Sequence, residues 1–181
     1  MTTVATGPVS LGDELPAFAG LAGADGRTWA RGDFEEACVL ALVFVGNGCP
    51  TVRLYEERLA GLQRLHADRG LQIVLVNSNN AHLSPPDTYE RLVERAARSA
   101  LPFPYLKDED GALARGCGAI CTPHAFVFDG DRRLRYRGRI DDSRTGHNVS
   151  STDLAGAVGD LLEGRAVRVP ETEPFGCAIV W

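Results

Sequence analysis

Residues 37–51 read ACVLALVFVGNGCPT, and this stretch decides the fold of the chain. The run from Cys38 to Val45 is apolar without interruption, as expected for a parallel strand that is covered on both faces. The two glycines that follow allow a sharp turn, and Pro50 suits the first position of a helix, because the amide that it lacks would be unpaired there. We therefore expect a buried strand, a tight turn and a helix that begins next to Cys49.

The position of Cys49 points to a chemical role. Unpaired N–H groups and the helix dipole favour negative charge at a helix start, so they lower the pKa of a thiol there. The hypothesis is a reactive thiolate. The alternative is a small apolar residue that fills a turn, since free cysteine is among the most buried residue types.

Composition narrows the possible functions. The 181 residues, 44% of them hydrophobic, predict one domain over 1–181, with extended terminal segments at 1–15 and 166–181. A net charge of −5 gives no reason to expect nucleic acid or an anionic membrane as a partner. The one basic run, Arg132–Arg139, alternates along an apparent strand and is interpreted as a solvated edge face.

The cellular setting is expected to be the cytoplasm. The sequence shows neither a signal peptide nor a run of about 20 apolar residues that could span a bilayer. The five cysteines are an odd number in a reducing compartment, which argues against a structural disulfide framework.

A second strand is expected at Leu71–Val76. Between it and the first strand, apolar residues recur at spacings of three and four from Val52 to His66, which predicts a helix that Gly70 ends. Parallel strands joined in this way end at the same edge of the sheet, so the loop 77–82 should lie on the same side as Cys49. Asn77, Asn79 and His82 are candidates for lining a site, or they are ordinary turn formers.

The remaining elements follow from turn and capping signals. We expect a small N-terminal hairpin within 16–29, a helix that starts at the capping-box spacing of 87–90, a polar turn with a short helix at 107–118, and an antiparallel hairpin over 126–139. Residues 150–153 are expected to cap a last helix that Gly164 ends, and an extended tail follows.

This order of elements resembles the thioredoxin fold, an α/β fold with a mixed central sheet flanked by helices, here with an N-terminal hairpin extension. More closely, the chain resembles the redoxin branch of the alkyl hydroperoxide reductase and thiol-specific antioxidant superfamily. The matching stretches are GDELPAF at 12–18, the turn to Cys49-Pro50, VNSN at 76–79, FPYL at 103–106, CTPH at 121–124, FVFD at 126–129, YRGRIDD at 136–142 and the closing GCAIVW at 176–181.

The chain departs from these relatives at two positions. Many of them carry a Cys-x-x-Cys pair whose second cysteine matches Cys49, whereas the first position is Gly46 here, so a local dithiol disulfide is impossible. In the peroxidases of the superfamily, a Thr that binds peroxide stands at the position of Gly46, and an Arg stands at that of Pro123. These two departures therefore argue against ordinary peroxidase catalysis.

The resemblance also implies a second cysteine at the site. The Pro123 loop resembles the cis-proline loop that packs over the reactive cysteine, and residues two apart in an extended chain share a face, so Cys121 is expected to point toward Cys49. The alternative is that Cys121 packs as a small hydrophobe. Cys177 either folds back as a resolving thiol or packs. Cys38 is expected to be inert, and Cys117 is left undecided.

Three functions remain. The first is a thiol-dependent oxidoreductase without a cofactor, with Cys49 and Cys121 as catalytic residues, a thiol or disulfide substrate, and a thioredoxin-type protein or small thiol as reductant. Its substrate groove would be formed by Pro123, Thr122, Pro50, Asn47 and Asn77. The second is a copper or zinc site of Cys49, Cys121 and His124, with His82 as a further candidate. The third is a redox-inactive binding module.

Overall fold

The computed structural model describes residues 7–181, so the first part of the predicted extended segment 1–15 lies outside the described residues. Its main feature is a seven-stranded sheet with the strand order β2-β1-β5-β4-β3-β7-β8. These strands are β1 (Leu21–Gly23), β2 (Thr28–Trp29), β3 (Val39–Phe44), β4 (Leu71–Asn77), β5 (Tyr105–Lys107), β7 (His124–Phe128) and β8 (Leu134–Gly138). The pairs β3–β4 and β4–β5 are parallel and the others antiparallel, which confirms the mixed sheet of a thioredoxin fold.

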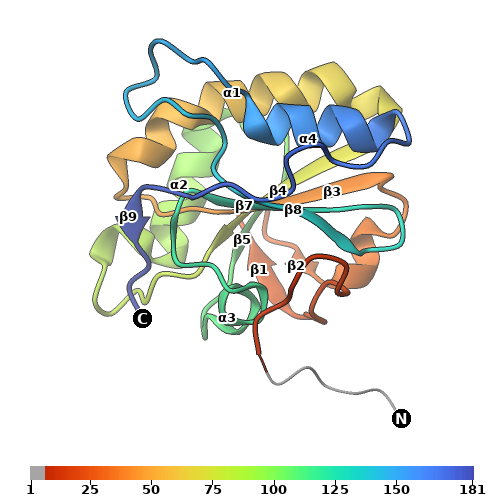
Figure 1. The fold of residues 1–181 in the computed structure, drawn as a ribbon. Coiled ribbons are helices and arrows are strands. Elements are labelled where there is room, and N and C mark those ends of the chain that lie inside the picture. Colours follow the sequence, from red (N-terminus) through yellow and green to blue (C-terminus); the bar gives the residue numbers. More distant parts are fainter. Residues whose placement is uncertain (1–6) are drawn as a thin grey trace.

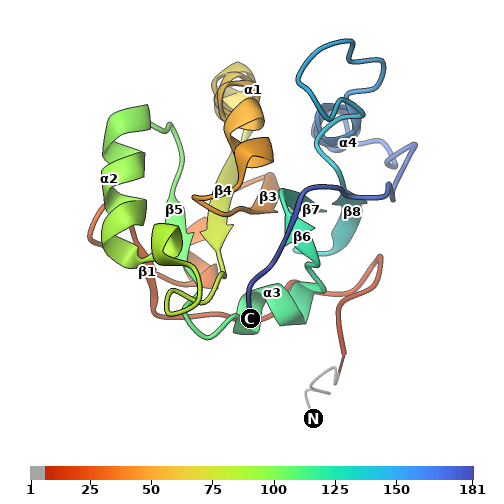
Figure 2. The ribbon, with the colours of Figure 1, turned by 90° about the vertical axis from the view of Figure 1, so that its left-hand side faces the viewer.

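Helices cover both faces of the sheet. They are α1 (Pro50–His66), α2 (Tyr89–Ser99), α3 (Ala112–Cys117) and α4 (Asp153–Leu162), with short 3-10 turns η1 (Arg31–Phe34), η2 (Ala67–Arg69) and η3 (Pro85–Asp87). Helices α1, α2 and α4 lie on one face, and α3 lies on the other (Figures 1 and 2). No helix within residues 7–181 is both long and apolar enough to cross a bilayer.

Successive side chains of β3 point to opposite faces of the sheet and belong to two separate hydrophobic cores. Val39, Ala41 and Val43 belong to the core under α1, α2 and α4, whereas Leu40, Leu42 and Phe44 belong to the core on the α3 side. All six side chains are at most 1% exposed, which explains the uninterrupted apolar run in the sequence.

The central strand–turn–helix unit forms as predicted. Cys49 is the N-cap of α1, and Pro50 occupies its first turn. The apolar stripe of α1 buries Val52, Tyr55 and Leu59 against the sheet. After η2 the chain ends the helical segment at Gly70, whose φ of 90° is readily adopted only by glycine.

Two interpretations of polar residues need correction. Asp87 belongs to η3 and is buried, while Thr88 caps α2 by accepting a hydrogen bond from the Arg91 amide at 3.4 Å. In the basic run, Arg132 is not solvated: it is 5% exposed and donates to the carbonyls of Phe34 and Ala37. The buried carbonyls at the end of η1 require donors, which a side-chain period cannot reveal.

The sequence did not predict β5 or a second, two-stranded sheet. Strand β5 has only three residues and ends in a lysine, so it carries no clear period. The second sheet pairs β6 (Cys121–Thr122) antiparallel with β9 (Cys177–Ala178) from the tail. Figure 2 shows the tail passing beside β6 and ending near α3. The tail is therefore extended, as expected, but it is also built into the fold.

Candidate active site

The turn after β3 places Cys49 at the carboxyl edge of the parallel strands. The Cys49 amide donates to the Gly46 carbonyl at 3.2 Å, which closes the turn, and α1 begins directly afterwards. The thiol lies beneath the surface and is part of the core under α1, since Cys49 is only 4% exposed. A bulky partner must therefore displace neighbouring chain to reach the sulfur.

A buried carboxylate, Asp87, holds this turn. It accepts hydrogen bonds from the Asn47 amide at 2.7 Å, from the side chains of Asn77 at 2.7 Å and Asn79 at 3.0 Å, and from the Ser84 hydroxyl at 2.5 Å. Asp87 thus ties the turn before Cys49 to the loop after β4. Sequence analysis assigned Asp87 only to a capping box, because a chain motif does not show that a residue faces another turn.

The predicted groove residues divide into two groups. Asn47 and Asn77 are 5% and 0% exposed, and Tyr105 bridges them: its hydroxyl donates to Asn47 Oδ1 at 2.7 Å and lies 3.4 Å from Asn77 Nδ2. Asn47 and Asn77 are thus buried supports of the turn before Cys49. Pro50 is exposed at the start of α1, and Pro123 is buried in the loop that follows β6.

The loop that contains Thr122 and Pro123 touches Cys49 directly. The peptide bond between these two residues is cis, and the Cys49 thiol donates to the Thr122 carbonyl at 3.1 Å. Thr122 is 2% exposed, and its buried hydroxyl has no hydrogen-bond partner among residues 7–181. It lies 3.4 Å from the position that a Cβ at Gly46 would occupy. A hydroxyl on this side of the turn is free to donate to a thiolate.

The surroundings of Cys49 favour its ionised form. Burial by itself would raise the pKa of the Cys49 thiol, because it removes water from the thiolate. The side chains of Cys177 and Thr122 and the amides of Val52 and Cys177 can donate to the thiolate and outweigh burial, so the pKa of Cys49 falls below its ordinary value.

Two further thiols lie near Cys49. The Cys121 thiol is 3.8 Å from the Pro123 carbonyl, and burial followed by the charge of Cys49 raises its pKa to about 11. Cys177 packs against the core that contains Cys49, and its thiol is placed to donate a hydrogen bond to the Cys49 thiolate. Burial and this hydrogen bond raise the pKa of Cys177 to about 11 as well. Cys49 is therefore the thiol that ionises first.

The other cysteines lie elsewhere. Cys38 is exposed just before β3, so its expected position inside the central strand is wrong by one residue, because the strand pairing with Leu71 begins at Val39. Cys117 ends α3 in the core on the opposite face of the sheet. Neither residue belongs to the site.

The residues proposed for copper or zinc do not gather. His124 belongs to β7, pairs with Phe44 and lies 4.4 Å from the Phe126 ring, on the face of the sheet away from Cys49. Burial lowers the pKa of His124 to about 4. His82 is exposed in the loop after β4. Within residues 7–181, no three His, Cys, Asp or Glu side chains lie close enough together to hold a metal ion.

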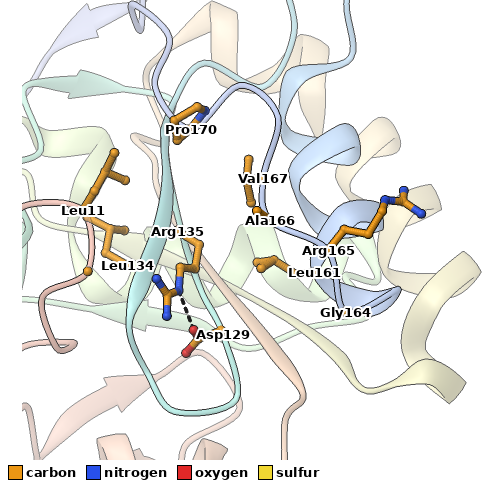
Figure 3. Close-up of a pocket in the computed structure, with 11 residues that line it drawn as sticks. Leu11, Asp129, Leu134, Arg135, Leu161, Gly164, Arg165, Ala166, Val167 and Pro170 are labelled. Atoms are coloured by element: carbon orange, nitrogen blue, oxygen red, sulfur yellow. Dashed lines mark hydrogen bonds and ion pairs between the residues drawn. The ribbon is translucent and has the colours of Figure 1, made fainter.

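A hollow elsewhere on the surface contains none of the predicted site residues. This cavity of about 570 Å³ lies between the β7–β8 hairpin and the segment after α4, as Figure 3 shows. Asp129 and Arg135 form an ion pair at its edge at 2.6 Å. No cysteine lines this cavity, so it offers no thiol chemistry.

Two solved structures are similar to nearly the full length of this chain. A hypothetical protein from Sinorhizobium meliloti is 36% identical over 96% of this chain and 95% of its own, with a TM-score of 0.89. An uncharacterized conserved protein from Geobacillus kaustophilus is 35% identical over 95% and 92%, also with a TM-score of 0.89.

A more distant match shares the fold. A putative thiol:disulfide interchange protein DsbE from Chlorobium tepidum is 20% identical over 86% of this chain and 97% of its own, with a TM-score of 0.65. Among proteins with curated descriptions, none matches significantly. The Redoxin family model matches residues 10–155, which include Cys49 and Pro123. The chain therefore belongs to the Redoxin family.

Proposed function

We propose that this protein is a thiol–disulfide oxidoreductase in which the Cys49 thiolate attacks a sulfur atom of a disulfide substrate. The observation that carries the proposal is the surroundings of Cys49 at the start of α1, where four hydrogen-bond donors favour the thiolate despite burial. Membership of the Redoxin family supports a redox function of this type. A redox-inactive binding module would have no need for such surroundings.

The proposed reaction requires only sulfur chemistry. Attack by Cys49 gives a mixed disulfide and releases the first substrate thiolate. A second thiol, either Cys121, Cys177 or an external thiol, then attacks and releases the rest of the substrate. A thioredoxin-type protein or a small thiol returns the enzyme to its reduced form. We propose that no metal or other cofactor takes part and that the protein works in the cytoplasm.

Within the site, we assign supporting roles to the predicted groove residues. Thr122 and Pro123 flank the sulfur and form one wall of the groove, while Pro50 forms the exposed rim. Asn47 and Asn77 act indirectly, because they are buried in the network that fixes the turn. A disulfide approaching Cys49 would thus meet the Thr122–Pro123 loop first.

Alkylation of the thiols as a function of pH tests the proposal. In the wild type, iodoacetamide should modify Cys49 with a midpoint below the roughly 8.5 of an unperturbed thiol. Cys49→Ser should remove this low-pH phase, whereas Cys38→Ser, which changes an exposed thiol outside the site, should keep it. A Cys49 midpoint at or above about 8.5 would contradict the activation of this thiol.

Peroxide is the alternative substrate for the same thiol. Gly46 and Pro123 stand where the resemblance places the groups that hold peroxide in peroxidases, so we expect Cys49 to react more slowly with hydrogen peroxide than with a small disulfide. Stopped-flow measurement of both reactions decides between them. A fast reaction that saturates with peroxide would assign the protein as a peroxidase, with the free Thr122 hydroxyl as the first residue to examine.

A further inference from the structure

The tail brings a second cysteine to Cys49. Strand β9 pairs antiparallel with β6, so that Cys177 lies opposite Thr122 and Ala178 lies opposite Cys121. Residues that are directly opposite in such a pair have side chains on the same face, whereas neighbours along a strand point to opposite faces. Cys177 therefore shares the face of the Thr122 side chain, and Cys121 lies on the other face. The Cys49 thiol in turn donates to the Thr122 carbonyl at 3.1 Å.

A glycine makes this approach possible. At Gly176, a Cβ atom would collide with the Thr122 carbonyl oxygen and would lie 2.7 Å from its carbonyl carbon. The φ of Gly176 is 154°, a value that other residues rarely adopt. The backbone of the tail can therefore lie directly against the loop over Cys49, which brings Cys177 into contact with the core around that thiol.

The residues after Cys177 anchor the tail. Ile179 is 7% exposed and belongs to the core on the α3 side of the sheet. The Val180 amide donates to Asn79 Oδ1 at 2.9 Å, and its carbonyl accepts from the Asn80 amide at 2.7 Å. The Trp181 ring lies under the guanidinium of Arg115, 4.4 Å from its centroid. Cys177 is thus held at the site from both sides.

From this arrangement we infer that Cys177 is the resolving thiol of Cys49, and that oxidation joins the two residues in an intramolecular disulfide that fastens β9 over the site. The inference rests on the proposed function, because it assumes that Cys49 attacks disulfides. It selects Cys177 over Cys121, which had been the expected partner. It also accounts for the Gly-Cys-x-Ile-x-Trp sequence at 176–181, because Gly176, Ile179 and Trp181 position Cys177, and Cys177 itself reacts.

The chemistry balances with a small disulfide as the oxidant. The Cys49 thiolate attacks one sulfur, a Cys49–sulfur bond forms, the substrate disulfide breaks, and the first thiolate leaves. Cys177 then loses its proton to solvent and attacks the Cys49 sulfur, and the second substrate thiolate leaves and takes up a proton. Two protein thiols have been oxidised by two electrons, and one disulfide has been reduced to two thiols.

The order of the two steps follows from the charges. While Cys49 is a thiolate, burial, the hydrogen bond to Cys49 and its charge raise the pKa of Cys177, so Cys177 stays protonated and acts as a donor. Once Cys49 is part of a mixed disulfide, its negative charge is gone. The pKa of Cys177 then falls at the moment when its thiolate is needed.

Oxidised glutathione provides the test. The full chain is treated with it and analysed by intact mass and peptide mapping, alongside Cys177→Ser and the matched control Cys121→Ser. The wild type and Cys121→Ser should lose two hydrogens and yield a Cys49–Cys177 cross-linked peptide. Cys177→Ser should instead stop with one glutathione on Cys49, because the thiol that displaces it has been removed.

Two other results would overturn the inference. A wild-type protein that keeps glutathione on Cys49, or cross-links Cys49 to Cys121, would exclude Cys177 as the resolving thiol but leave the reactive Cys49 intact. A wild-type protein without any adduct or cross-link at Cys49 would overturn the proposed function as well. Circular dichroism of both serine variants checks that their folds match the wild type.

Discussion

Cys49 and Cys117 are both buried thiols next to a helix, yet their surroundings favour opposite protonation states. Cys49 precedes the first residue of α1, whereas Cys117 is the last residue of α3. Hydrogen-bond donors lower the pKa of Cys49 although burial opposes them. At Cys117, burial and then the charge of Asp108 raise the pKa far above its ordinary value. Burial alone thus does not decide thiol reactivity; the donors aimed at the sulfur do.

Each thiol lies near a buried aspartate with a structural role. Asp87 accepts the Asn47 amide and fixes the turn before Cys49. Asp108 accepts the amides of Leu113 at 3.2 Å and Ala114 at 3.0 Å, and the Ser78 hydroxyl at 2.7 Å, so it holds the first turn of α3. The two carboxylates do similar structural work, but only Asp87 acts on the proposed site.

The largest contrast is expected when the thiols themselves are replaced. Cys49→Ser should lower the rate of disulfide reduction by about a hundredfold or more, because the attacking sulfur is lost. Cys117→Ser should leave this rate unchanged, because its thiol faces the other core. Reduction of oxidised glutathione with a dithiol as reductant measures both. An equal loss in both variants would remove the distinction between the two regions.

Replacing the aspartates separates stability from reactivity. Asp87→Asn and Asp108→Asn should each lower the free energy of unfolding by about 1.5–3 kcal/mol, the range for hydrogen bonds to charged groups. Only Asp87→Asn should also slow the alkylation of Cys49, since it loosens the turn that places this thiol. Urea unfolding and iodoacetamide kinetics give the two values. Equal alkylation rates in the two variants would show that Asp87 has no effect on the site.

The glycines of the turn offer a finer test. A Cβ at Gly46 would lie 2.7 Å from the side-chain nitrogen of Asn79, which Asp87 and the Val180 amide hold in place. Gly46→Ala should therefore cost about 1–3 kcal/mol of unfolding free energy, as overpacking does. Gly48→Ala, whose Cβ would lie 3.5 Å from Pro86, should change it by no more than about 0.5 kcal/mol. Similar costs measured by urea unfolding would contradict the packing at Gly46.

The smallest expected effect is a difference in the pH dependence of stability. The lowered pKa of Cys49 stabilises the fold at pH values above the roughly 8.5 of the unfolded thiol, and this contribution is lost as the pH falls through the folded pKa. The raised pKa of Cys117 contributes below about 8.5 and is lost as the pH rises.

Serine variants distinguish the opposite pH dependences of the stability that Cys49 and Cys117 contribute. Between neutral and alkaline pH, the stability lost in Cys49→Ser should grow, and that lost in Cys117→Ser should shrink. Unfolding free energies of the wild type and both variants at a series of pH values provide the measurement. Changes in the same direction for both variants would mean that the two thiols titrate alike.

The sequence alone determined the central unit of this protein. The apolar run of β3, the turn glycines and Pro50 act within a few residues of one another, so local rules place Cys49 at the start of α1. The crossover to β4 and the β7–β8 hairpin followed from periodicity and turn signals in the same way. These features depend on backbone preferences and on which side chains avoid water, and both are written locally.

Only the tertiary structure decided what surrounds the thiol. Thr122 and Cys177 approach Cys49 from two separate segments, and Asp87 from a third holds the turn before it; no spacing in the chain connects these residues. Cys121 was the expected partner because it shares the Pro123 loop, whereas the pairing of β6 with β9 puts Cys177 on the face of Thr122. A two-stranded pairing between distant segments leaves no period in the sequence, because packing and backbone hydrogen bonds form only when the whole chain has folded.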